Sequence, residues 1–496
     1  KHLTIIGNGT GTLTLNGKSN GQETLIMIEE DTGYFTLGIG GILANNTATN
    51  YGGAVYMKGG TFTMKGGTIA NNTATNYGGA VYMKGGTFEM SGGSIANNTA
   101  SEHGGAVYMA GGTFTMKGGT IANNTATSGF GGALSVDGDN NNKVTITLSG
   151  TAKISNNTAT NGGGVFMKGG NTEITLSDNA EISNNKAVEG SVGTLGTGHG
   201  GGVHIDDGTF TMSNNAKIAG NTANTSGGGV YVKSGTFTMT GGSITNNTAE
   251  FGFGGALCVD GDNYKVTITL SGTAKISNNK AVEGSVGMLD TGHGGGVHVD
   301  DGTFSINESV IITGNKAKKN GGGVYVHSDG RFVMSGGEIS DNTAATNGGG
   351  VCANTTGVFE MSNGKITENK ATGSGGGVCM KDGSHYFTMS GGTISSNTAT
   401  YGTGVYVGSI FNLNGEGTVN GVYLPNGKNI TVTGELDGAT KVTGIIPAIQ
   451  QENVLVVDLA AVQMDYLSRF KLDESVKNFA LKHQTSSTAG LVLVPT

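Results

Sequence analysis

The sequence contains no tryptophan, only 3 prolines and only 3 cysteines among 496 residues. So few cysteines exclude a scaffold built on disulfide bonds, and their odd number leaves at least one thiol unpaired within the chain. Charged residues make up 13% of the sequence, the net charge is -8, and there is no basic run, so the electrostatic signature of a nucleic-acid binder is missing. No apolar run approaches the roughly 18 to 20 residues of a membrane-spanning helix. We therefore expect no nucleic-acid partner and no transmembrane segment.

Glycine is the residue that the sequence has in excess. Its 94 glycines recur in pairs and triplets between short apolar runs, without the every-third-residue period of collagen. Alignment on the apolar residue that follows these glycines gives a spacing of about 26 or 27 residues in most steps. The aligned residues are Val55, Val81, Val107, Leu134, Val165, Val203, Val230, Leu257, Val297, Val324, Val351, Val378 and Val405. This regularity predicts one repeat array rather than several globular domains.

Within one repeat, three short runs alternate apolar and polar residues. Examples are Val81-Tyr82-Met83, Thr113-Phe114-Thr115-Met116 and Thr120-Ile121. Such alternation is typical of strands with one buried face, and the array shows no helical period. Three strands per repeat joined by glycine turns predict an all-β fold, a right-handed parallel β-helix (solenoid) of about 13–15 coils that rise about 4.8 Å each. We expect N-terminal capping coils in residues 1–37, the β-helix in residues 38–420, and a small β-rich C-terminal cap or accessory domain in residues 421–496.

The alternation also predicts which side chains fill the interior. The expected inward residues include Val81, Met83, Phe114, Met116 and Ile121. One further inward column is asparagine in every repeat, always two residues before an alanine, and includes Asn72, Asn98, Asn124, Asn221 and Asn247. Because a primary amide both donates and accepts, asparagines in register can hydrogen-bond along the stack and to the turn backbone. We therefore predict a structural asparagine ladder in which aspartate would be destabilising.

The repeat carries two short motifs in a fixed order. Ile69-x-x-Asn72 is followed by Gly78-Gly79-Ala80-Val81. This pairing resembles the Phe-x-x-Asn and Gly-Gly-Ala-Ile motifs of the polymorphic outer-membrane proteins of Chlamydia and, more broadly, bacterial β-helical surface adhesins. The resemblance covers about residues 35–410. It implies a secreted or cell-surface protein whose partner is an extracellular protein or glycan.

The residue after each aligned valine should point outward and is often tyrosine or histidine. We consider Tyr56, Tyr82, Tyr108, His204, Tyr231 and Tyr325 candidate ligand-binding residues. Aromatic rings supply contact area at low entropic cost, which suits a sugar- or protein-binding face. The structural alternative is that tyrosine simply fits the exterior of a strand. Cys352 and Cys379 fall in the same column on adjacent coils, and we expect them to be free thiols.

A second outward column lies two residues further along and contains aspartates next to histidines. Candidate acid/base residues are Asp260, Asp300, His298 and His327. Candidate metal ligands, with calcium as one possible ion, are Asp206, Asp207, His293 and Asp301. Carboxylates close together can raise the pKa of one of them, as a general acid requires, and carboxylates with histidine can bind metals. The alternative is solvated surface charge beside an inserted loop that ends near His293.

These patterns favour a binding or structural role over an enzyme. The sequence predicts a β-helical adhesin or structural stalk that binds host or matrix molecules along a lateral face, without an essential cofactor. A polysaccharide lyase or glycoside hydrolase on the same scaffold is the alternative, because fold does not determine function. A minor alternative is ice binding, suggested by paired threonines such as Thr113 and Thr115, although Glu89 and Glu173 interrupt that array. The sequence carries no signal of oligomeric state.

Overall fold

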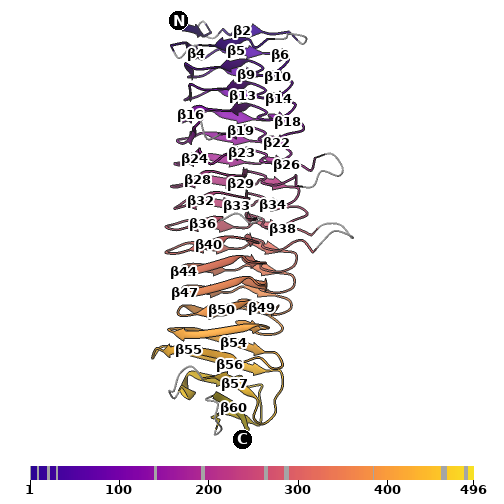
Figure 1. Ribbon diagram of the computed structural model, residues 1–496, viewed down its shortest axis with the longest axis vertical. Helices are drawn as coiled ribbons and strands as arrows, with labels where there is room; N and C mark the ends of the chain where they lie inside the picture. The colour runs from indigo at the N-terminus through magenta and orange to yellow at the C-terminus, as the bar shows by residue number, and fades with distance from the viewer. Residues whose placement is uncertain are drawn as a thin grey trace. The chain divides into compact units, whose positions relative to one another are not determined.

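The computed structural model describes residues 2–7, 11–18, 23–29, 32–138, 142–190, 196–261, 266–283, 290–383, 385–459, 466–484 and 490–496. Two compact units are present, Lys1–Glu250 (unit 1) and Phe251–Thr496 (unit 2), and each is described by itself. Both are parallel β-solenoids, with about 16 turns in all, which confirms the predicted fold class (Figure 1). Residues 191–195 and 284–289, in the two longest insertions, lie outside the described residues.

A complete turn contains four strands. In the turn that begins at Val55, β7 (Val55–Met57), β8 (Thr61–Met64) and β9 (Thr68–Ala70) are the three predicted strands. The two-residue strand β10 (Thr73–Ala74), which the alternation pattern did not reveal, follows the asparagine corner. Each strand pairs in parallel and in register with its counterpart one turn away, as β8 does with β12 through Phe62 and Phe88. The strands of each unit therefore form four ladders.

The ladders of unit 1 have the following strands. The first ladder contains β3 (Ile26–Ile28), β7, β11 (Val81–Met83), β15 (Val107–Met109), β19 (Leu134–Asp137), β23 (Val165–Lys168), β27 (Val203–Ile205) and β31 (Val230–Val232). The second contains β1 (His2–Ile5), β4 (Tyr34–Leu37), β8, β12 (Thr87–Met90), β16 (Gly112–Met116), β20 (Val144–Leu148), β24 (Thr172–Leu176), β28 (Thr209–Met212) and β32 (Thr236–Met239). The third contains β2 (Leu13–Asn16), β5 (Gly41–Ala44), β9, β13 (Ser94–Ala96), β17 (Thr120–Ala122), β21 (Lys153–Ser155), β25 (Glu181–Ser183), β29 (Lys217–Ala219) and β33 (Ser243–Thr245). The fourth contains β6 (Thr47–Ala48), β10, β14 (Thr99–Ala100), β18 (Thr125–Ala126), β22 (Thr158–Ala159), β26 (Lys186–Ala187), β30 (Thr222–Ala223) and β34 (Thr248–Ala249).

Unit 2 has the same four ladders, but several of its strands run through a corner. The first ladder contains β35 (Leu257–Val259), β39 (Val297–Val299), β43 (Val324–Val326), β46 (Val351–Thr355), β49 (Val378–Gly383) and β52 (Val405–Val407). The second and third ladders contain β36 (Thr267–Leu270), β37 (Lys275–Ser277), β40 (Thr303–Ile306), β41 (Ile311–Thr313), β50 (Tyr386–Met389), β51 (Thr393–Ser395), β53 (Ile410–Gly415), β55 (Ile430–Leu436) and β57 (Leu455–Asp458), and the long strands β44 (Arg331–Ser340) and β47 (Val358–Thr367) that span both. The fourth contains β38 (Lys280–Ala281), β42 (Lys316–Ala317), β45 (Thr343–Ala344) and β48 (Lys370–Ala371).

The last turns of unit 2 are simpler. β54 (Thr418–Leu424) passes directly from the third ladder to the first and pairs in parallel with β56 (Lys441–Pro447), which pairs with β58 (Phe470–Leu472). A short 3-10 helix (Leu467–Arg469) precedes β58, and β60 (Gly490–Pro495) then pairs antiparallel with β57 and with β59 (Phe479–His483). Parallel pairing thus continues past residue 421, and the predicted domain division stays a prediction. Among the described residues, no helix has the length and apolar content needed to cross a membrane.

The interior of each turn is filled by stacked apolar columns, as predicted. The predicted inward residues are fully buried: Val81, Met83, Phe114, Met116 and Ile121. In unit 1 the rings of Phe62 and Phe88 stack 4.5 Å apart, and in unit 2 those of Phe359 and Phe387 stack 4.6 Å apart. Fully burying a large apolar side chain contributes roughly 1.5–3 kcal/mol. Because one turn cannot enclose these side chains alone, every turn depends on its neighbours.

The asparagine column forms the predicted ladder. Nδ2 of Asn72 donates to Oδ1 of Asn98 (3.0 Å) and to the backbone oxygens of Leu43 (3.1 Å) and Ala70 (3.0 Å). The backbone N–H of Asn72 donates to the same Oδ1 at 3.0 Å. The residue before each ladder asparagine, such as Asn71 with φ 55°, adopts the left-handed conformation that asparagine tolerates. The five predicted members are fully buried: Asn72, Asn98, Asn124, Asn221 and Asn247.

Candidate functional site

A second column of side chains covers the outward face of the first ladder. It comes from the residue immediately before the first glycine of the glycine-rich turn in each repeat. It includes Tyr51, Tyr77, His103, Phe130 and His199 in unit 1, and Phe253, His293 and Tyr401 in unit 2. Most of these rings stack on the outward residue of the next-but-one first-ladder strand along the chain, as Tyr77, which precedes β11, does on Tyr108 of β15. Ring centroids of Tyr77 and Tyr108 are 4.8 Å apart, for example, and those of His199 and Tyr231 are 4.4 Å apart. We call these residues the covering column.

The covering column corrects the expectation of an exposed aromatic stripe. Of the candidate ligand-binding residues, four are buried: Tyr108, His204, Tyr231 and Tyr325. The other two, Tyr56 and Tyr82, are half-buried. Alternation correctly places all six facing away from the core, but it cannot show that the loop after the fourth strand returns across them. The signal that could have revealed this is the recurrent ring before the paired glycines.

Near the beginning of unit 1 the rings remain partly open to solvent. The centroid of Tyr51 lies 4.7 Å from that of Tyr82 and 5.6 Å from that of Tyr77, and Tyr56 packs edge-on against Tyr82 at 5.1 Å. Tyr51 is 36% exposed. Desolvation by burial, with the neighbouring tyrosines, raises the pKa of Tyr82 to about 12, so its hydroxyl stays protonated at neutral pH. We call Tyr51, Tyr56, Tyr77 and Tyr82 the tyrosine cluster.

Further along unit 1 the stack contains two histidines. The ring of His204 lies 5.0 Å from Phe166 and 4.8 Å from Tyr231, and His199 stacks on the same tyrosine. Burial disfavours the imidazolium, so the pKa of His199 is lowered to about 4 and that of His204 is well below its usual value. At neutral pH both rings are therefore neutral aromatic members of the stack.

The candidate metal ligands of unit 1 already have partners. Asp206 forms an ion pair with Lys233 at 3.3 Å, and Oδ1 of Asp207 accepts a hydrogen bond from the backbone N–H of Gly208 at 2.7 Å. Within the described ranges, no group of three or more histidine, cysteine, aspartate or glutamate residues is arranged to hold a metal ion. A calcium site that uses Asp206, Asp207, His293 or Asp301 stays a prediction.

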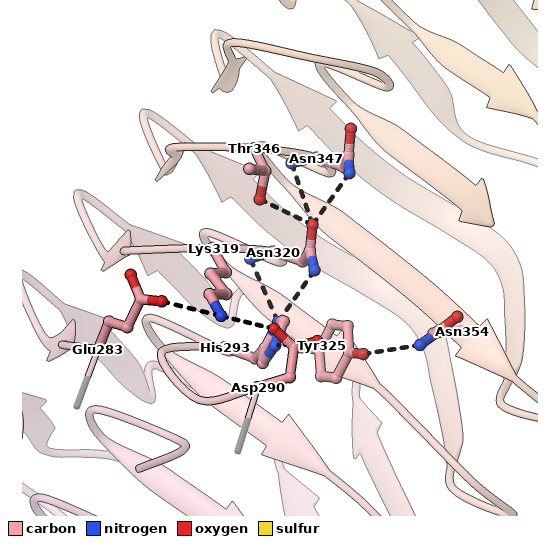
Figure 2. Close-up of polar contacts among 9 residues, drawn as sticks. All are labelled: Glu283, Asp290, His293, Lys319, Asn320, Tyr325, Thr346, Asn347 and Asn354. Carbon is pink, nitrogen blue, oxygen red and sulfur yellow. Dashed lines mark hydrogen bonds and ion pairs between the residues drawn. The ribbon is translucent and has the colours of Figure 1, made fainter. Parts of the chain in front are cut away.

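In unit 2, a polar cluster lies at the base of the second insertion (Figure 2). Nζ of Lys319 contacts Oδ1 of Asp290 at 2.7 Å and Oε1 of Glu283 at 2.9 Å. The hydrogen bonds to Asp290 and Glu283 raise the pKa of Lys319, so this ion pair is charged at neutral pH. Since Glu283 and Asp290 lie on either side of residues 284–289, Lys319 connects the two described segments of the insertion.

His293 connects this cluster to the covering column. Its Nδ1 accepts hydrogen bonds from the backbone N–H (3.3 Å) and from Nδ2 (3.1 Å) of Asn320, and its ring stacks on Tyr325 at 4.4 Å. Nε2 lies 3.3 Å from Oδ2 of Asp290, a close contact that is not aligned as a hydrogen bond. Because a backbone N–H can only donate, Nδ1 carries no proton. Burial lowers the pKa of His293 to about 4, so the ring is neutral at neutral pH and its single proton is on Nε2.

Beyond His293 the covering column becomes a second amide ladder, which sequence reasoning missed. Oδ1 of Asn320 accepts from Oγ1 of Thr346 (2.9 Å) and from the backbone N–H (3.2 Å) and Nδ2 (3.1 Å) of Asn347. Oδ1 of Asn347 then accepts from the backbone N–H of Ser374 at 2.9 Å. The available signal was an asparagine before the paired glycines in two successive repeats. In the next-but-one first-ladder strand after each of these amides, β46 after Asn320 and β49 after Asn347, the outward residue is a cysteine, Cys352 or Cys379, rather than an aromatic ring.

Those cysteines are free, as expected. Cys352 and Cys379 are opposite each other in β46 and β49, and both are buried. A hydrogen bond with Cys352, together with burial, raises the pKa of the Cys379 thiol. The third cysteine, Cys258, is also buried, with its Sγ 3.8 Å from Nδ1 of His298.

The candidate acid/base residues are brought together only in part. Nδ1 of His327 lies 2.8 Å from Oδ1 of Asp300 and 2.9 Å from Oγ of Ser328. His298 does not join this contact. Its ring is part of the aromatic stack outside β39, with its centroid 5.3 Å from that of Tyr325. Asp260 follows β35 at the position that Asp300 occupies after β39. Of these four candidates, the structure therefore joins Asp300 and His327 in a carboxylate–imidazole pair.

The electrostatics of this pair differ from the expectation for a general acid. Desolvation raises the pKa of Asp300, but the hydrogen bond with His327 and the nearby His298 outweigh it and lower that pKa to about 2. The hydrogen bond with Asp300 raises the pKa of His327. A general acid needs a raised carboxyl pKa, so the shift has the opposite sign. Asp300 and Ser328 also contact the same ring nitrogen, Nδ1 of His327. In a Ser-His-Asp triad the serine and the aspartate contact different nitrogens of the imidazole.

The comparisons with known proteins agree with the fold. Residues 309–327 match the Chlamydia polymorphic membrane protein repeat. Comparison with curated proteins and with solved structures gave no match. The matched segment contains Ile312, Asn315 and the glycines from Gly321, which are the motif positions of the repeat. The chain is thus a β-helical protein with repeats like those of polymorphic membrane proteins.

Proposed function

We propose that the chain is the binding or stalk part of a secreted or surface-displayed β-helical adhesin, and that it engages an extracellular protein or glycan along one lateral face. The repeat match and the solenoid fold support the surface class of protein. The observation that carries the binding role is the tyrosine cluster, whose rings lie on successive turns of unit 1 and are partly open to solvent.

The tyrosine cluster has properties that favour binding. Tyrosine supplies a large amphipathic contact area with only two rotatable side-chain bonds to order. The strands beneath it are in register, as Tyr56 opposite Tyr82 shows, and the rings pack on one another. The surface is therefore arranged before a ligand arrives, which reduces the entropic cost of binding.

A binding screen with matched variants tests this proposal. The purified chain is applied to a glycan array and to a panel of extracellular matrix proteins. For any ligand found, Tyr51→Ser should weaken binding roughly tenfold, which corresponds to about 1.4 kcal/mol. Tyr34→Ser is the control, because Tyr34 is exposed in unit 1 but is not part of the cluster. If both variants bind as well as the unaltered chain, the tyrosine cluster is not the binding surface.

Polysaccharide cleavage lacks a comparable supporting observation. Its best candidate, the Asp300–His327 pair, has a carboxyl pKa shifted away from the value that general acid catalysis needs. Ice binding also has no independent support, because Glu89 stands directly opposite Thr115 in the threonine array. Release of reducing ends or unsaturated sugars from any polysaccharide in the same screen would favour the enzyme instead.

A further inference from the structure

Near the end of unit 2 the covering column stops, while the ladder beneath it continues. Tyr406 of β52 pairs with Tyr423 of β54, and Tyr423 pairs with Ile446 of β56. Tyr401 still lies against Tyr423, with ring centroids 5.0 Å apart, but β54 runs directly from the third ladder to the first, so this turn adds no further ring to the covering column. Tyr401, in the turn before, is the last residue of the covering column and is 49% exposed. Among the residues that the structure describes, no ring of the covering column therefore lies over the first ladder beyond Tyr423.

A pocket of about 280 Å³ occupies this position. Its walls include Tyr401, Tyr423, Ile446 and Asp473. Its floor contains three glycines with positive φ, Gly402, Gly421 and Gly444. A Cβ at Gly421 would lie 1.9 Å from Oγ1 of Thr403 and 3.0 Å from the backbone nitrogen of Gly404, so a side chain there would require Thr403 to move. The pocket is mainly apolar, with one acidic group at its wall.

The two tyrosines give the pocket a concave aromatic wall. Their ring centroids are 5.0 Å apart and the ring planes are inclined by 52°. Tyr423 is in turn supported by Tyr406, which stacks nearly parallel to it at 5.7 Å. Inclined rings present two negatively polarised faces toward one volume, which is how proteins surround alkylated ammonium groups.

Asp473 adds a fixed negative charge. The backbone N–H of Asp473 donates to the oxygen of Ile445 at 3.0 Å, and Oδ1 accepts from the backbone N–H of Ser475 at 2.9 Å. Hydrogen bonding by the backbone and the side chain of Ser475 lowers the pKa of Asp473, so the carboxylate is ionised at neutral pH. A carboxylate that is held by neutral donors beside apolar walls retains its attraction for a cation.

We propose that this pocket binds an organic ammonium cation, with the alkylated ammonium group against Tyr401 and Tyr423 and its charge opposite Asp473. The volume suits a small head group rather than a folded partner. The charge excludes phosphate and carboxylate ligands, and the paucity of polar groups on the wall disfavours a fully hydroxylated sugar. This site is independent of the tyrosine cluster of unit 1 and of the proposed function.

The test uses the full chain with choline as the probe. Binding is measured by calorimetry and by the change in tyrosine fluorescence. The chain has no tryptophan, so the tyrosine signal can be observed directly. The matched neutral probe is 3,3-dimethylbutanol, which has the same shape without the charge. We expect choline to bind at least roughly fivefold more tightly than 3,3-dimethylbutanol, because only choline can form a cation–π contact with the two tyrosines. Equal binding of both probes, or binding of N-acetylglucosamine but not choline, would overturn the proposal.

Two variants separate the charge from the fold. Asp473→Asn retains an oxygen that can accept the N–H of Ser475 but removes the charge, so it should weaken choline roughly fivefold and leave the neutral probe unchanged. Glu474→Gln is the control, because Glu474 is the exposed neighbour and does not line the pocket. Tyr401→Leu should weaken choline while the melting temperature stays within a few degrees. If Asp473→Asn and Glu474→Gln affect choline equally, the site assignment is wrong.

Discussion

The asparagine ladder allows a sharp test, because several ladder asparagines directly follow an exposed asparagine in the chain. Asn98 is fully buried, whereas Asn97 is exposed and left-handed with φ 56°. Replacement of either residue by aspartate changes the same atoms, and aspartate tolerates the left-handed conformation. The two variants therefore differ only in whether the new carboxyl joins the ladder.

The expected cost follows from the hydrogen bonds of Asn98. Its Nδ2 donates at 3.0 Å to each of three oxygens, those of Ile69, Ala96 and the Asn124 side chain. In Asn98→Asp an acceptor replaces this donor, whose two hydrogens serve the three oxygens, so about two hydrogen bonds are lost at about 1 kcal/mol each, and the new carboxylate oxygen faces three acceptors at further cost. We expect unfolding free energy to fall by about 3 kcal/mol in Asn98→Asp and by less than about 0.5 kcal/mol in Asn97→Asp.

The loss in Asn98→Asp should depend on pH. A protonated carboxyl restores one donor, so the folded state raises the pKa of the new group above its unfolded value of about 3.9. The folded protein then binds more protons, and stability falls as pH rises from about 4 through the folded pKa. Urea unfolding followed by circular dichroism at several pH values measures this. Equal midpoints for the two variants would show that the ladder amides do not contribute to stability.

Three further predictions concern the histidines and the cysteines. Acidification from about pH 6.5 to about pH 4 should lower the melting temperature, because His199 and His293 are neutral in the folded state with pKa values of about 4 and regain protons at about 6.5 when unfolded. A flat profile over this range would contradict their burial as neutral rings. Asp300→Asn should lower the pKa of His327, which Asp300 raises, and proton NMR titration of the imidazole measures the change. An unchanged titration would mean that the 2.8 Å contact is absent in solution. All 3 cysteines should resist a thiol reagent in the folded chain and react fully in denaturant, because all are buried. Rapid reaction of the folded chain would refute this burial.

Local patterns were sufficient for the solenoid and its interior. Side chains of a strand alternate between two faces, so the runs around Val81 and Phe114 reveal which residues point inward without knowledge of their neighbours. The asparagine column could be predicted for a similar reason. Strands of equal repeats stack in register, and an amide is one of few side chains that can bond to a copy of itself. The fourth two-residue strand was missed because Thr73 and Ala74 are too few to show a period.

Only the tertiary structure decided what becomes of the outward side chains. Alternation placed Tyr108, Tyr325 and His298 outside the core, yet the loop that returns before the paired glycines buries them under a second column. The contact joins residues of different turns, such as His293 and Tyr325, so no single repeat encodes it. The same holds for the low pKa of Asp300, which depends on His327 one turn away. Sequence alternation determines which side of a strand a residue faces, whereas exposure and charge depend on the segment that packs over that side.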